Sequence, residues 1–214
     1  MLEYRWEPSR IQVTFSAKPH VSPVFLTRQA KGRLQHALRV SGRPTPFSRK
    51  VSLGTVGDNT NDDVESYIAN QVVKEPVVDE RFQEKLRQFT VVNPEVDLTS
   101  PTSTKRGRYW YNLHLVLIVE KRERLNDLNE LATIRDRSLK LAAFHGYGLS
   151  RLALVPDHMH LALRGNVAHS PQEIALKFLN NTAYALGQCA VWEPCYYAGT
   201  FGAYNMNALR HKPV

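Results

Sequence analysis

The chain has 214 residues, of which 43% are hydrophobic, and 28 Lys and Arg against 20 Asp and Glu give a formal net charge of +8. This length allows one large or two small domains with a hydrophobic core, and the positive surplus suits a polyanion, most simply nucleic acid. Cys189 and Cys195 lack CxxC spacing, which argues against a cysteine zinc site and a disulfide framework. No apolar stretch could span a bilayer, which argues against a membrane protein. Together these features predict a cytoplasmic protein.

The first part of the chain predicts a strand, a helix, a glycine turn and a second helix. Ser22-Pro23 is a typical helix start, with Ser as the cap and Pro in the first turn of a helix over residues 24–38. A short strand then leads to the turn Gly54-Thr-Val-Gly57. Asn and Asp residues clustered after this turn predict another helix cap. In that helix Tyr67 and Gln71 are four residues apart, so they share one face.

Residues 76–107 are predicted to be a connector. Pro76 and Pro94 interrupt it, and the tract Thr99-Ser-Pro-Thr-Ser-Thr104 is polar and rich in turn formers. A short helix is expected within it, over residues 79–88.

A basic and aromatic cluster follows the connector. Lys105, Arg106 and Arg108 run directly into the aromatic triplet at residues 109–111. Basic and aromatic groups together suit the backbone and the bases of nucleic acid. The alternative is a solvated loop whose aromatic residues begin a core strand.

The second half predicts the order strand, helix, strand, helix, strand. Residues 111–119 form an apolar strand, and residues 124–144 have helical period and end near Gly146. Residues 151–163 read as one buried strand, and residues 172–186 as a helix. This order predicts an α+β fold in which an antiparallel sheet carries helices on one face.

Two histidines lie within the apolar run, in Pro156-Asp-His-Met-His-Leu161. On a strand, residues two apart point to the same face, so His158 and His160 are side by side and Met159 turns into the core. Such a pair supplies imidazole ligands for a divalent metal. The alternative is two structural histidines. Asp157 is either a partner that orients a histidine or a surface aspartate of the turn.

The chain also contains an apparent repeat. The segment Pro8–Pro23 aligns without gaps on Pro156–Pro171, and each segment leads into a predicted helix. The turn Gly54-Thr-Val-Gly57 then matches Gly199-Thr-Phe-Gly202. Three matches in one order predict a duplication. We expect a first unit at residues 1–75 with the tyrosine helix, and a second unit at residues 108–214 with the histidine strand.

The two copies differ at the residues that carry chemistry. Where the second copy has His158 and His160, the first has Arg10 and Gln12. The position in the second copy that corresponds to Tyr67 is Lys212. One copy therefore keeps the histidines and the other keeps the tyrosine.

Together these motifs resemble the single-tyrosine HUH transposases, in particular the REP-associated tyrosine transposase group, where HUH denotes His, bulky hydrophobic, His. The resemblance covers most of the chain outside the connector. It is carried by Pro156-Asp-His-Met-His-Leu161, Tyr196-Tyr-Ala-Gly-Thr-Phe-Gly202, Val51-Ser-Leu-Gly-Thr-Val-Gly57 and Tyr67-Ile-Ala-Asn-Gln71.

The resemblance implies a ferredoxin-like sheet and a metal-dependent endonuclease and strand transferase that acts on single-stranded DNA beside a hairpin. By the same resemblance, His158, His160 and Gln71 would bind Mg²⁺ or Mn²⁺. Tyr67 would attack the scissile phosphate and remain joined to the 5′ phosphate of the DNA.

The order of the motifs departs from the family, in which the histidines usually precede the tyrosine. We therefore expect a fused pseudo-dimer with one composite active site, and the sequence leaves a homodimer of such chains open. The candidate DNA-binding residues are basic: Arg28, Lys31, Arg33, Arg39, Lys105, Arg106 and Arg108.

Two other functions compete with this one. The first is a domesticated, non-catalytic protein that binds hairpin DNA. The second is a metal-dependent hydrolase that uses water at the two histidines, and its cleavage would survive Tyr67→Phe.

Overall fold

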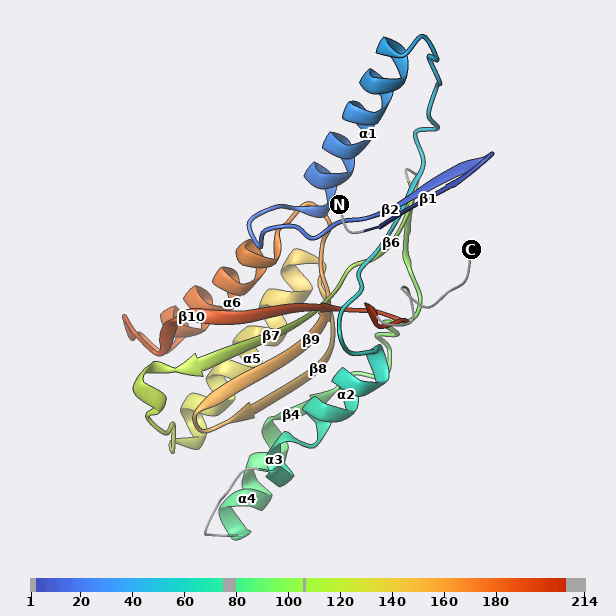
Figure 1. Ribbon diagram of the computed structural model, residues 1–214. Coiled ribbons are helices and arrows are strands. Elements are labelled where there is room, and N and C mark those ends of the chain that lie inside the picture. Colours follow the sequence, from blue (N-terminus) through green and yellow to red (C-terminus); the bar gives the residue numbers. More distant parts are fainter. Residues whose placement is uncertain (1–2, 75–79, 106, 207–214) are drawn as a thin grey trace.

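A five-stranded antiparallel sheet organises the protein, in the strand order β10-β7-β9-β8-β4 (Figure 1). The computed structural model describes residues 3–74, 80–105 and 107–206. The five strands are β4 (Thr90–Val92), β7 (Asn112–Val119), β8 (Gly148–Val155), β9 (His158–Arg164) and β10 (Trp192–Phe201).

Helices α5 (Leu128–His145) and α6 (Pro171–Ala185) cover one face of this sheet. Strand β7 shows why, because its buried leucines alternate with His114 and other residues that point to the opposite face. Helix α5 ends at Gly146, which adopts the left-handed conformation with φ 66°. Helix α6 begins with a reciprocal capping box between Ser170 and Glu173.

Helix α2 (Asn61–Ala69) lies on the other face of the sheet. Thr60 and Asp63 form its capping box. Val64 and Ile68 are buried against a small cluster that includes Ala153, Ala162, Leu98 and Phe201. Two short helices, α3 (Gln71–Lys74) and α4 (Glu80–Leu86), and a 3₁₀ turn, η1 (Arg87–Phe89), lead on to β4.

The remaining elements lie outside the main sheet. Strands β1 (Glu3–Glu7) and β2 (Arg10–Thr14) form a separate ribbon, and α1 (Pro23–Val40) projects away from the sheet (Figure 1). A small sheet has the order β3-β6-β5, with β3 (Val51–Gly54), β5 (Thr102–Thr104) and β6 (Gly107–Trp110). The 3₁₀ turn η2 (Glu120–Arg122) follows β7.

The predicted α+β class and antiparallel sheet are confirmed, with two corrections. The prediction that helices cover one face was incomplete, because α2 packs on the other. The single strand predicted over residues 151–163 is wrong: β8 and β9 form a hairpin that reverses at Pro156-Asp157. Proline has no N–H for a strand ladder, and Pro-Asp favours a turn.

The predicted duplication is not shown by the structure. Strand–helix–strand order recurs, as β2-α1-β3 and β9-α6-β10, but the described residues contain only one five-stranded sheet. The first strands of the two segments, β2 and β9, differ in their burial. Strand β9 is buried over almost its whole length, whereas β2 alternates Ile11 and Val13 with exposed polar residues. The predicted connector contributes β4 to the main sheet and β5 to the small one.

In the part of the chain that the structure describes, no helix combines the length and apolar character that a membrane crossing requires.

Candidate tyrosine–histidine site

The β8–β9 hairpin presents His158 and His160 on the face that α2 covers in part. The two imidazole rings lie side by side, with centroids 4.8 Å apart. Met159 points the other way and is fully buried, where the Ser138 hydroxyl donates to its sulfur at 3.8 Å. The predicted placement of these three side chains is confirmed.

Asp157 orients His158. The Nδ1 atom of His158 lies 2.6 Å from Oδ1 of Asp157, and the other carboxylate oxygen accepts from Arg122 at 3.3 Å. A carboxylate only accepts, so Nδ1 of His158 carries the proton. The remaining ring nitrogen, Nε2, is left as the ligand atom.

His160 is oriented by a third histidine, His114 on β7. Nε2 of His114 lies 3.0 Å from Nδ1 of His160, and the two rings stack with centroids 5.2 Å apart. Burial lowers the pKa of His114 to about 4. Burial, and then the nearby His158, His114 and Lys74, lower the pKa of His160 to about 3. Both imidazoles are therefore neutral at pH 7, the form that binds metals.

Helix α2 places Tyr67 against these histidines. The Tyr67 ring meets His160 edge-on at a centroid distance of 5.4 Å and His114 at 6.1 Å. The tyrosine is 43% exposed, so a ligand can reach it. The ammonium of Lys74 lies 4.5 Å from the centre of its ring. We call Tyr67, His114, His158 and His160 the tyrosine–histidine site.

Polar contacts to β8 hold α2 in this position. The carboxylate of Glu65 accepts from the hydroxyl of Ser150 and lies 3.6 Å from the guanidinium of Arg151. The neighbouring Ile68 is fully buried. Because Ser150 is buried and the side chains of Glu65 and Arg151 are each only 21% exposed, this contact restricts how α2 sits on the sheet.

Gln71 is buried four residues after Tyr67, and its side chain is hydrogen-bonded to that residue. Its amide nitrogen donates to the carbonyl oxygen of Tyr67 at 3.0 Å. That bond does not use the carboxamide oxygen, which is the atom that binds metals. Among the described residues, no group of three or more His, Cys, Asp and Glu side chains is arranged to hold a metal ion.

A cavity of about 180 Å³ opens beside His114 and is also lined by Asp58, Tyr197 and Gly199. The Tyr197 ring lies 5.5 Å from His114, and its hydroxyl occupies the space that a side chain at residue 199 would need. The cavity gives the site a polar extension towards β10.

The sequence did not reveal His114, Lys74 or Tyr197 as members of this region. No role was predicted for His114 from the sequence. The sequence does contain a pattern that indicates its position: leucines at every second position of β7 place His114 on the face opposite to the core.

The predicted DNA-binding residues are spread over two regions. Arg28, Arg33 and Arg39 are exposed on α1, and Lys31 on the same helix donates to the backbone carbonyl of Ser48. Lys105 and Arg108 are exposed near β6, and Arg10 and Gln12 are exposed on β2. Arg106 and Lys212 lie outside the described residues.

Comparison with known proteins gives partial structural matches only. No family model matches the chain, and no curated protein matches it by sequence. Among the solved structures that resemble part of it are two whose descriptions name a transposase.

The first is a candidate transposase from Deinococcus radiodurans R1, which is 18% identical with a TM-score of 0.38, over 41% of this chain and 75% of that one. The second is a REP-associated tyrosine transposase bound to a REP hairpin. It is 14% identical with a TM-score of 0.39, over 47% of this chain and 61% of that one.

Proposed function

We propose that the chain is a metal-dependent endonuclease and strand transferase that acts on single-stranded DNA through a 5′-phosphotyrosine intermediate on Tyr67. One observation carries the proposal. A partly exposed tyrosine meets one imidazole of a side-by-side histidine pair at 5.4 Å, within a single chain. Such an arrangement suits a covalent nucleophile beside a cation-binding pair.

In the proposed reaction, Oη of Tyr67 attacks the phosphorus of a phosphodiester. The bond from phosphorus to the 3′ oxygen breaks, the phenol loses its proton, and the leaving 3′ oxygen gains one. The 5′ side of the DNA is then esterified to Tyr67. Because the phosphodiester bond is exchanged and not hydrolysed, a 3′ hydroxyl can later attack the tyrosine ester and rejoin the strand.

The proposed metal ligands are His158 and His160 through Nε2, and Gln71 through its carboxamide oxygen. The imidazoles fit this role, since both lie on one face and each has its Nδ1 atom occupied by another side chain. A bound Mg²⁺ or Mn²⁺ would neutralise charge that develops on the phosphate oxygens. For Gln71, whose amide nitrogen donates to the Tyr67 carbonyl, the role requires that the carboxamide oxygen face the histidines.

The experiment is covalent capture of DNA. Single-stranded oligonucleotides with a flanking hairpin are incubated with Mn²⁺ and the full chain, and a protein–DNA adduct is sought on a denaturing gel. We expect an adduct that is lost in Tyr67→Phe, in His158→Ala and in EDTA. Tyr184→Phe is the matched control, because Tyr184 is 81% exposed on the distant α6.

A second candidate function is a hairpin DNA-binding protein without cleavage. It is favoured by the described residues, which contain no group of three or more His, Cys, Asp and Glu side chains arranged to hold a metal ion. Tight hairpin binding without any adduct would support this function. Cleavage that persists in Tyr67→Phe would instead indicate hydrolysis by water at the histidines.

A further inference from the structure

The positive charge of the chain is concentrated in one segment. Residues 8–57 contain nine Lys and Arg and no Asp or Glu. The rest of the chain therefore holds 19 of the 28 basic residues and all 20 acidic residues, and is close to neutral. A charge surplus confined to one segment marks a surface for a polyanion more specifically than a high net charge does.

Most of this segment is the exposed helix α1 and the chain that returns from it. Of the 18 residues of α1, only Pro23 is buried, and the helix projects from the body of the protein (Figure 1). Helices in proteins usually owe their stability to packing, so an exposed helix of this length suggests a missing partner. The spacing of Arg28, Gln35 and Arg39 places them on one face, about 120° or more from Arg33.

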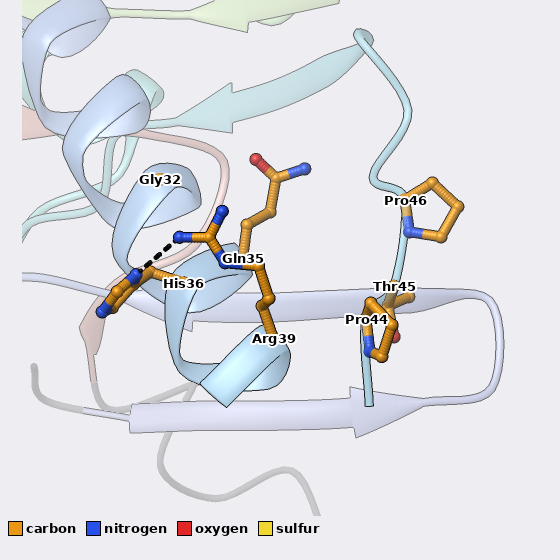
Figure 2. Close-up of a pocket in the computed structure, with 7 residues that line it drawn as sticks. All are labelled: Gly32, Gln35, His36, Arg39, Pro44, Thr45 and Pro46. Carbon is orange, nitrogen blue, oxygen red and sulfur yellow. Dashed lines mark hydrogen bonds between the residues drawn. The ribbon is translucent and has the colours of Figure 1, made fainter. Parts of the chain in front are cut away.

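A cleft of about 510 Å³ lies along this face (Figure 2). Gly32, Gln35, His36 and Arg39 form one wall, and the segment Pro44-Thr45-Pro46 forms the other. The guanidinium of Arg39 lies 3.1 Å from Nδ1 of His36, which orients it and leaves its other N–H donors for a ligand.

Two features of α1 shape the surroundings of the cleft. Lys31 donates to the carbonyl of Ser48 and so ties the return segment to α1. Gly32 lies at the middle of the helical wall, and a side chain there would meet nothing within 4 Å. The helix backbone is therefore accessible to a bulky ligand at this point.

We infer that α1 and residues 41–50, which we call the basic arm, bind the phosphate backbone of duplex DNA, with one phosphate held in the cleft by Arg39. The inference rests on the proposed function for the identity of the polyanion as DNA. A helix about 10–12 Å wide fits the major groove, and 18 residues span about 27 Å, on the order of 8 base pairs. The basic arm would hold a hairpin stem while the tyrosine–histidine site acts on a single strand.

The test is the salt dependence of duplex binding by the full chain. Fluorescence anisotropy is measured with a blunt duplex and with one of its single strands, for wild type, Arg28→Glu, Arg39→Glu and Lys140→Glu. Lys140→Glu is the matched control, since it makes the same charge change at an exposed position on α5, outside the basic arm. Arg39→Gln removes the charge without reversing it, and circular dichroism verifies that the helix is retained.

We expect Arg28→Glu and Arg39→Glu each to weaken duplex binding roughly tenfold at low salt, and to reduce the salt slope by about one each. Lys140→Glu should change affinity by less than about twofold. Equal losses in all three variants would overturn the inference, as would duplex binding no tighter than single-strand binding.

A second readout separates this inference from the proposed function. Adduct formation on a strand without a stem should be unchanged in the basic-arm variants. If wild type forms no adduct on any substrate but duplex binding depends on Arg28 and Arg39, the proposed function is wrong and the inference that the basic arm binds duplex DNA is supported.

Discussion

The ring of Tyr67 meets the ring of His160 edge-on at 5.4 Å, although the tyrosine lies on a helix from the first third of the chain and the histidine on the central strand β9. Both come from one chain, so a site of this kind needs no second subunit. Its geometry depends on how α2 sits on the sheet, and on the side chains that orient each imidazole.

Asp157 should control how well His158 binds a metal. Asp157→Ala removes the 2.6 Å hydrogen bond that fixes the ring and its tautomer, and we expect Mn²⁺ affinity to fall about 10- to 100-fold. Isothermal titration measures this change. Asp136→Ala is the control, because Asp136 is exposed on α5. Equal Mn²⁺ affinities in the two variants would show that Asp157 is only a structural residue of the β8–β9 turn.

The two glycine turns that matched in the sequence contact each other in the structure. The hydroxyl of Thr55 donates to the carbonyl of Phe201 at 2.7 Å, and the hydroxyl of Thr200 donates to the carbonyl of Val56 at 2.5 Å. The contact is reciprocal, because each turn supplies the same donor and the same acceptor position. It joins the chain just before α2 to the end of β10.

Gly57→Ala should disturb this contact and with it the position of α2. A Cβ atom at residue 57 would overlap the carbonyl of Thr200, and backbone on both sides would have to move. We expect a loss of about 1–3 kcal/mol in the free energy of unfolding, measured in urea. Gly54→Ala is the matched control, since a Cβ there meets nothing within 4 Å. Similar stability of the two variants would contradict this account.

Local patterns in the sequence predicted much of the site. Alternation placed His158 and His160 outward and Met159 inward, and the capping residues before α2 set Tyr67 on a helix. His114 could not be assigned in this way. Its contact with His160 depends on the register of β7 and β9, in which His114 faces Ala162 and Val116 faces His160.

The turn between β8 and β9 and the placement of α2 also could not be predicted from local sequence patterns. The apolar run over residues 151–163 suits one strand or two, and the turn at Pro156 is decided by the pairing of β8 with β9. The side of the sheet on which α2 packs depends on the small Ala153 and Ala162, which leave room for Ile68. Both are tertiary choices that no short segment encodes alone.

Acid should weaken the loop that supports α2. Asp97 accepts from the hydroxyls of Ser100 and Thr99 and from the Thr99 N–H, and these bonds lower its pKa from 3.8 to about 2. The folded state therefore binds this proton less readily than the unfolded chain does. The stability that Asp97 contributes is complete only above about pH 5 and is lost as the pH falls towards 2.

Thermal melting between pH 2 and pH 5 tests this expectation. Asp97→Ala should be less stable than wild type at pH 5, and the difference should shrink as the pH approaches 2. The neighbouring Leu98 packs with α2, so the variant should also loosen that helix. A difference in melting temperature that stays constant over this range would contradict the assigned role of the carboxylate.

Lys74 should speed the covalent step on Tyr67. Its ammonium lies 4.5 Å from the tyrosine ring, where a phosphodiester approaching Oη brings negative charge into a partly buried region. Lys74→Met keeps the aliphatic stem and removes the charge, so we expect roughly tenfold slower adduct formation in single-turnover experiments with saturating DNA. Lys74→Arg, which retains the charge, should be close to wild type. If Lys74→Met also reacts at the wild-type rate, the lysine only packs against the ring and the charge at the site comes from elsewhere.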